Sequence, residues 1–131
     1  RDAPVLAIAA RSAKAASWRE REAAARLLGT LGPSAATSLT QCLMDTNGFV
    51  REAAATALGQ THDRRAAKAL LRAFSDTVAK VRVAAAHAAG ELGFATLRPP
   101  LERLRKDLSK EVRRAAKSAL ATFPGQSPTP R

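Results

Sequence analysis

Aromatic and sulfur-containing side chains are scarce in this sequence. It has no tyrosine, one tryptophan, four phenylalanines, one methionine and one cysteine. A single cysteine excludes a disulfide within the chain and fits a reducing compartment, so we expect a cytoplasmic protein. Few aromatic rings disfavour recognition of single-stranded nucleic acid, which depends on base stacking. No apolar run approaches the roughly 18 residues of a membrane span, and we expect no transmembrane segment.

Acidic side chains are also few. The 131 residues include 11 Asp and Glu against 22 Lys and Arg, a formal net charge of +11. Such an excess of positive charge attracts nucleic acid, anionic membranes or acidic proteins. The alternative is that the arginines only reflect a genome rich in Ala and Arg codons.

A segment rich in alanine and arginine recurs along the chain. Its copies occupy residues 20–29, 49–59, 80–90 and 111–120, and one arginine marks the same place in each: Arg21, Arg51, Arg82 and Arg113. An aspartate stands six residues before the last three of these arginines, at Asp45, Asp76 and Asp107, whereas the first copy has Ala15 there. A fixed period near 31 residues indicates a repeat array.

The pattern of Asp, then Val-Arg, then Ala-Ala and Ala-Leu-Gly resembles the HEAT repeat, in the short form of the phycobilisome bilin lyases. The resemblance extends from about Pro4 to Phe123. It implies an all-α, right-handed α-solenoid of about four helix–turn–helix repeats. We expect a repeat domain over residues 1–123, with repeats at about 3–30, 31–60, 61–91 and 92–123. Residues 124–131 are expected to form a Pro-rich flexible tail or linker, and the whole to be a piece of a longer protein.

Helix boundaries are marked by capping residues and prolines. Ser17 and Glu20 have the spacing of a capping box, which would open an inner helix at Trp18. Further N-caps are expected at Asn47, Asp63 and Ser109, whereas Val78 occupies the equivalent place without a capping side chain. Pro99-Pro100 falls within the fourth outer helix, which either begins there or is kinked there.

Three rows of inner-helix residues are expected on an open concave face. They are Glu22, Glu52, Val83 and Arg114; Ala25, Ala55, Ala86 and Lys117; and Arg26, Thr56, His87 and Ser118. A basic cluster follows near the C-terminal end, at Arg98, Arg103, Arg105, Lys106, Lys110, Arg114 and Lys117. We therefore predict a partner-binding set of Arg26, Glu52, Thr56, Val83, His87, Arg103, Lys106, Lys110, Arg114 and Lys117.

The repeated aspartates and arginines have a structural interpretation. The HEAT resemblance implies a ladder of charged hydrogen bonds between adjacent repeats, formed by Arg21, Asp45, Arg51, Asp76, Arg82, Asp107 and Arg113. Cys42 aligns with Ala73 and Leu104, so we expect it to be buried. Trp18 either covers the end of the array or acts as a binding hot spot.

Catalytic motifs are not apparent. The sequence has no Gly-rich phosphate loop and no nucleophile elbow, and two isolated histidines, His62 and His87, make no metal site. We predict no enzyme, no cofactor and no metal. The leading hypothesis is a non-catalytic interaction scaffold or adaptor domain, monomeric in isolation, that binds an acidic protein through its concave face and basic C-terminal end. The alternatives are binding to the backbone of duplex DNA or RNA and, by family analogy, an accessory role in a bilin lyase.

Overall fold

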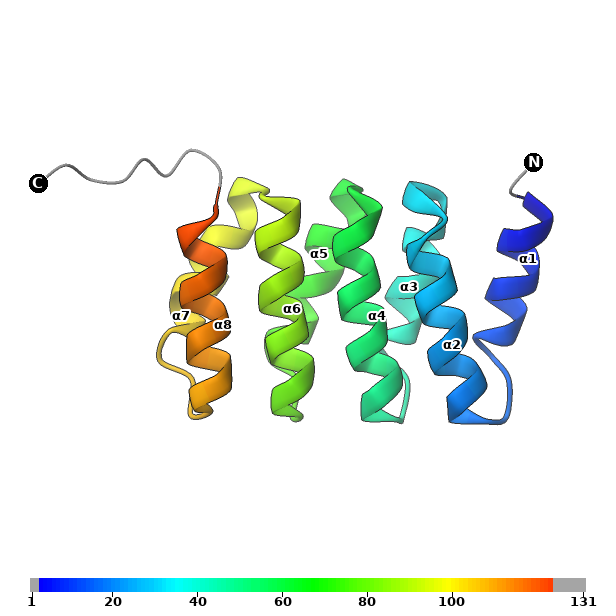
Figure 1. The fold of residues 1–131 in the computed structure, drawn as a ribbon, viewed down its shortest axis with the longest axis horizontal. Coiled ribbons are helices and arrows are strands. Elements are labelled where there is room, and N and C mark those ends of the chain that lie inside the picture. The colour runs from blue at the N-terminus through cyan, green and yellow to red at the C-terminus, as the bar shows by residue number, and fades with distance from the viewer. Residues whose placement is uncertain (1–2, 124–131) are drawn as a thin grey trace, which may run out of the picture.

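Eight α-helices in two rows form the protein in this computed structural model, which describes residues 3–123. Figure 1 shows α2, α4, α6 and α8 side by side in one row, with α3, α5 and α7 behind them and α1 at the N-terminal end. The predicted all-α solenoid of four helix pairs is confirmed. The predicted tail at 124–131 lies outside the described residues. The α-helices are α1 (Ala3–Ser12), α2 (Trp18–Gly29), α3 (Ala36–Cys42), α4 (Gly48–Thr61), α5 (Arg64–Ala73), α6 (Ala79–Leu92), α7 (Arg98–Leu104) and α8 (Lys110–Ala121).

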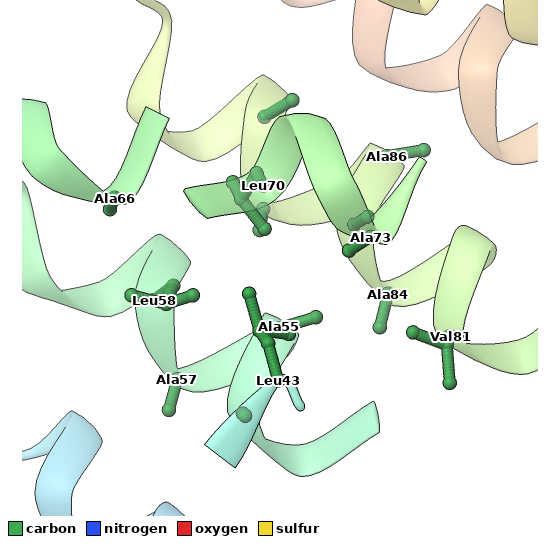
Figure 2. Close-up of a cluster of buried hydrophobic side chains, with 14 of the residues drawn as sticks. Leu43, Ala55, Ala57, Leu58, Ala66, Leu70, Ala73, Val81, Ala84 and Ala86 are labelled. Carbon is green, nitrogen blue, oxygen red and sulfur yellow. The ribbon is translucent and has the colours of Figure 1, made fainter. Parts of the chain in front are cut away.

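The core lies between the two rows. Leucines at equivalent places of the outer helices are fully buried, as are valines at the first turn of three inner helices. Figure 2 shows part of this core, with Leu58 of α4 and Leu70 of α5 in the same cluster. Each such side chain contributes about 1.5–3 kcal/mol by its burial. The fully buried members are Leu28, Leu39, Leu58, Leu70, Leu97, Leu101, Val50, Val81 and Val112.

Neighbouring inner helices approach closely because glycine lies at each contact. A Cβ placed on Gly59 would stand 2.8 Å from the Cα of Ala88, and one on Gly29 would stand 2.8 Å from the Cβ of Ala57. Real Cβ atoms do not tolerate such distances, so these two positions require glycine. The packing thus depends on the smallest residues of the repeat.

The helix caps follow the sequence with one exception. Asn47 accepts hydrogen bonds from the N–H groups of the first turn of α4, and Asp63 and Ser109 cap α5 and α8 in the same way. Val78 makes no cap, as predicted. The capping box at Ser17 is wrong, because its hydroxyl makes no hydrogen bond to α2. Ser17 and Glu20 are both exposed, so water can satisfy the first N–H groups instead.

The two prolines of the fourth repeat begin a helix and do not kink one. A short 3-10 turn, η2 (Ala95–Leu97), leads into α7, and Pro99 and Pro100 fall in the first turn of that helix. A proline there costs no hydrogen bond, since the first N–H groups of a helix have no partner within it. The second repeat has an analogous 3-10 turn, η1 (Gly32–Ala35), before α3.

Candidate interaction surface

The inner helices form a shallow hollow over α2, α4 and the start of α6. Its volume is about 630 Å³. Glu22 and Glu52 line it together with Thr56, so this part of the groove carries carboxylates. Arg26 also lines it, but its guanidinium bonds the Glu22 carboxylate at 2.7 Å. Lys80 also lines the hollow, so two carboxylates face two basic side chains. The N-terminal half of the concave surface is therefore close to neutral, in spite of the net charge of the chain.

An aromatic pair borders this hollow. The rings of Trp18 and Phe49 stack with centroids 5.3 Å apart, and the guanidinium of Arg19 lies 4.6 Å from the centroid of the Trp18 ring. Trp18 thus packs on the next inner helix, while Phe49 is 52% exposed. The sequence did not single out Phe49 as a surface residue. Trp18 stands three residues before Arg21, whereas Phe49 stands two residues before Arg51, so the two aromatic residues do not align when the repeats are superposed.

The predicted second row of the concave face is wrong. Ala25, Ala55 and Ala86 are fully buried, whereas Lys117, which aligns with them, is exposed. Each alanine lies four residues before Gly29, Gly59 or Gly90, which contact the next inner helix, so the row faces along the stack. Lys117 therefore belongs to the C-terminal end face of the array.

The basic residues are divided between the two rows of helices. Lys110, Arg114 and Lys117 are exposed on α8, an inner helix. Arg103 and Lys106 are exposed on or just after α7, which Figure 1 shows behind α8. Val83 and His87 lie on α6, the former half-buried and the latter exposed. The predicted partner-binding residues thus extend over the groove, the end face and the outer row.

The arginines of the repeat reach forward to the next repeat. Arg51 donates from Nε to Asp76 Oδ2 at 2.8 Å and from Nη2 to Asp76 Oδ1 at 3.2 Å. Arg21 contacts Asp45 in the same way, with Nε 2.7 Å from Oδ2, and Arg82 contacts Asp107, with Nε 2.9 Å from Oδ2. Each of these three arginines also donates from Nη1 to the backbone carbonyl six residues before it.

These pairs are largely shielded from water, and the pKa values of Arg21, Asp45 and Asp107 are shifted. Burial opposes ionisation of Asp45 and Asp107 and is the largest single effect on their pKa values. The hydrogen bonds from Arg21 and Arg82, together with those from the backbone N–H groups of Asn47 and Ser109 and the nearby arginine charges, outweigh it and hold the pKa of both carboxyls below the usual range. The Asp45 carboxylate in turn raises the pKa of Arg21. Side-chain exposures of only 10–17% at the Arg21–Asp45 pair support a structural role for such contacts.

Cys42 is buried between α3 and its neighbours, as predicted from its alignment. Burial raises the pKa of its thiol to about 11. Within residues 3–123, no group of three or more His, Cys, Asp or Glu side chains lies together as metal ligands would. None of the helices in that range is long and apolar enough to cross a membrane.

A family model for HEAT repeats matches residues 3–88, which is more than half of the sequence. The chain belongs to the HEAT-repeat family. Among curated proteins, none matches this HEAT-repeat chain. The family and the solenoid fold together support a repeat-based protein-interaction domain.

Solved structures share the solenoid at low sequence identity. Human deoxyhypusine hydroxylase in complex with glycerol aligns with 90% of the chain at a TM-score of 0.80 and 23% identity. The CpcE–CpcF complex of phycocyanin lyase from Nostoc sp. PCC7120 aligns with 92% at 0.78 and 24% identity. An engineered protein aligns with 93% at 0.65 and 20% identity. The chain spans 43%, 53% and 63% of those three chains, and the likeness shows a common fold.

The prediction of no enzyme, which rested on the absence of recognisable catalytic motifs, is contradicted by one of these structures. Human deoxyhypusine hydroxylase is an enzyme by its name, and it shares this HEAT-type fold over 90% of the chain. An array of helix pairs is therefore no argument against catalysis. The reason is that activity depends on individual side chains placed on a fold, and sequence motifs detect only some of those arrangements.

Proposed function

We propose that this domain binds an acidic protein partner through the exposed basic residues of α8 and the adjoining concave groove. The observation that carries the proposal is that Lys110, Arg114 and Lys117 are all exposed, while no ion pair within residues 3–123 includes any of them. At the other end of the array, by contrast, Arg21 and Arg26 are both paired with carboxylates. Among the inner helices, positive charge without an ion pair in residues 3–123 is thus concentrated on α8, where it would attract an acidic surface. The outer helix α5 also carries such charge, and it therefore provides the control below.

Binding to the backbone of a duplex is the competing function, and the groove disfavours it. A nucleic-acid backbone would follow a continuous basic track. Here Glu22 and Glu52 interrupt the N-terminal half of the concave surface, and Arg103 and Lys106 belong to the outer row of helices. A protein partner needs no such track, because rigid HEAT-type arrays present an extended surface with varied chemistry.

Affinity capture with matched variants tests the proposal. The change Arg114→Glu with Lys117→Glu reverses two charges on α8, and Arg64→Glu with Lys68→Glu reverses two exposed charges on α5 as a control. We expect the wild type and the α5 variant to capture a protein partner even after nuclease treatment, and the α8 variant to lose that partner. If no nuclease-resistant protein depends on α8, the proposal is wrong.

Salt dependence distinguishes the competing function. Each phosphate that a protein neutralises contributes about −0.9 to the slope of log affinity against log salt on duplex DNA. If Arg114 and Lys117 contact phosphates, replacing both by alanine reduces that slope by about two units on any DNA sequence. We expect weak DNA binding that disappears near physiological salt, with the protein partner still bound.

Two further properties are proposed with this function. A cytoplasmic location is supported by the single cysteine, which is unpaired and buried. A monomeric state of the isolated domain is supported by the charge of +11, because like charges repel one another when copies approach.

A further inference from the structure

Each of the inner helices α2, α4 and α6 presents a stripe of three residues to the next inner helix. The stripe, which we call the stacking stripe, consists of an arginine, an alanine and a glycine at intervals of four residues, on one helix face. The alanines are fully buried and the glycines contact the next inner helix. The three internal stacking stripes are Arg21, Ala25 and Gly29; Arg51, Ala55 and Gly59; and Arg82, Ala86 and Gly90.

The stacking stripe of α8 departs from this pattern. It consists of Arg113, Lys117 and Ala121, and both Lys117 and Ala121 are exposed. At the internal place equivalent to Ala121, a Cβ on Gly90 would already stand 3.0 Å from the Cβ of Ala119. Lysine in place of the buried alanine adds a long charged chain. An inner helix could therefore not pack on α8 at the spacing of the three internal contacts.

Arg113 nevertheless keeps the pose of the other arginines. Its Nη1 donates to Asp107 O at 2.7 Å and to Leu108 O at 3.1 Å. In Arg51 the same nitrogen donates to Asp45 O at 2.8 Å and to Thr46 O at 3.2 Å. The remaining edge of the Arg51 guanidinium holds a carboxylate, whereas the Nε and Nη2 of Arg113 have no hydrogen-bond partner within residues 3–123.

We propose that Arg113, with Lys117 and Leu108 beside it, is a docking site for an aspartate or glutamate side chain of an acidic partner segment. The proposal rests on the function proposed above and adds the chemistry of the partner. A guanidinium edge anchored at Nη1 is preorganised for a bidentate carboxylate, which the three internal pairs demonstrate in the same chain. Lys117 lies one helical turn further along the stripe and adds positive charge.

An acidic protein segment fits this place better than the other occupants. Leu108 is 98% exposed and its carbonyl bonds Arg113, so an apolar residue flanking the carboxylate would find a hydrophobic contact. A phosphate group, in contrast, carries no apolar side chain beside it that would pack on Leu108. Residues 124–131 contain neither Asp nor Glu, so they supply no carboxylate side chain for this site. A second copy of the chain would present Ala15 of its first repeat, at the position where the later repeats have aspartate, so it would supply none from that position either.

Peptide binding tests this site without knowledge of the partner. The probe is a fluorescein-labelled peptide in which aspartate alternates with leucine, and its control has asparagine in place of aspartate. Fluorescence anisotropy at physiological ionic strength compares the wild type with Arg113→Lys, which keeps the charge and loses the guanidinium fork. Arg72→Lys, on the exposed surface of α5, is the matched control.

We expect the aspartate peptide to bind, the asparagine peptide not to bind, and Arg113→Lys to weaken binding about tenfold, with Arg72→Lys unchanged. In NMR spectra of the wild-type arginine side chains, the Nε–H signal of Arg113 should shift with the aspartate peptide, while those of Arg21, Arg51 and Arg82 stay in place. Equal binding by Arg113→Lys and the wild type overturns the proposal. A larger shift of the Arg113 signal with a duplex DNA oligomer than with the peptide also overturns it, in favour of a phosphate ligand.

The outcomes separate this site from the broader function. If capture of a protein partner depends on Arg114 and Lys117 but the peptide is insensitive to Arg113, the proposed function stands and the carboxylate site is wrong. If the peptide binds at Arg113 but no partner depends on α8, the site is correct and the proposed function is wrong.

Discussion

Removing Arg82 from the ladder should lower the free energy of unfolding, and removing Arg113 should show how much of that loss comes from the carboxylate pair. Arg82→Ala deletes two hydrogen bonds to the Asp107 carboxylate, at 2.9 and 3.0 Å, and one to the carbonyl of Asp76. It leaves Asp107, whose side chain is 11% exposed, without its guanidinium partner. Breaking a fully buried ion pair costs about 3–5 kcal/mol. Because water reaches part of this pair, we expect a loss of about 3 kcal/mol in the free energy of unfolding.

Arg113→Ala is the closest control, because Arg113 makes the equivalent backbone contact, and one more, without a carboxylate in residues 3–123. It removes the bonds from Nη1 to Asp107 O and Leu108 O and the same length of aliphatic chain. Hydrogen bonds between a charged group and a neutral acceptor at a partly exposed site support a loss of about 1 kcal/mol. The difference of about 2 kcal/mol between the two variants then measures the contribution of the Asp107 carboxylate pair.

Urea denaturation followed by circular dichroism measures both losses, and thermal melting provides a check. For a domain of this size, 3 kcal/mol corresponds to a decrease of about 10 °C in the melting temperature. A double-mutant cycle that adds Asp107→Ala isolates the coupling between the two side chains. If Arg82→Ala and Arg113→Ala are equally stable, the carboxylate pair contributes nothing, and Arg82 would be available as a ligand-binding residue.

The remaining predictions concern packing, backbone and pH. Ala86→Leu should lower the free energy of unfolding by about 1–3 kcal/mol, because Ala86 is fully buried against the next inner helix, whereas Lys117→Leu at the equivalent exposed place should have little effect in the same denaturation assay. His62→Gly should raise stability by about 0.5–1 kcal/mol, because His62 has a φ of 56° at the end of α4, where α6 has Gly93; an unchanged melting temperature would contradict this. Acid should unfold the domain below about pH 4. The folded-state pKa values of Asp45 and Asp107 are lowered, so their stabilisation is present above the unfolded value and is lost as the pH falls through the folded one; Asp107→Asn should therefore flatten the acid limb of a stability-against-pH curve.

The fold was predictable because its signals are local and repeated. The 31-residue spacing of Arg51, Arg82 and Arg113 identifies the array, and Asn47 and Ser109 identify where inner helices begin. These residues act on their own turn of helix, so a single sequence contains the information. The Ser17 prediction failed because the same residue type can leave its hydroxyl to solvent when the first turn is exposed.

The surface was harder to predict, because it depends on small rotations of each helix. Ala54 and Ala55 differ by one residue, yet Ala55 faces the next inner helix, as its place four residues before Gly59 shows. Alanine occurs both on an exposed groove surface and at a buried contact between helices, so the residue type alone could not decide which of these two places Ala55 occupies. The direction of the ladder was equally hidden, since Arg82 has one aspartate six residues before it and another 25 residues after it. The structure shows that the carboxylate comes from the later aspartate.

The forward direction of the ladder makes the two ends of the array unlike each other. Arg21, Arg51 and Arg82 each donate from Nε and Nη2 to the aspartate of the next repeat. In Arg113 the same two groups have no such carboxylate within residues 3–123. Head-to-tail stacking of copies would use those donors only if the end faces fitted. Lys117 occupies the place of a buried alanine at one end, and Leu27, 42% exposed, occupies the place of Ala57 at the other. Both ends are thus too bulky for the internal contact, and the donors of Arg113 remain accessible to a ligand of a different kind.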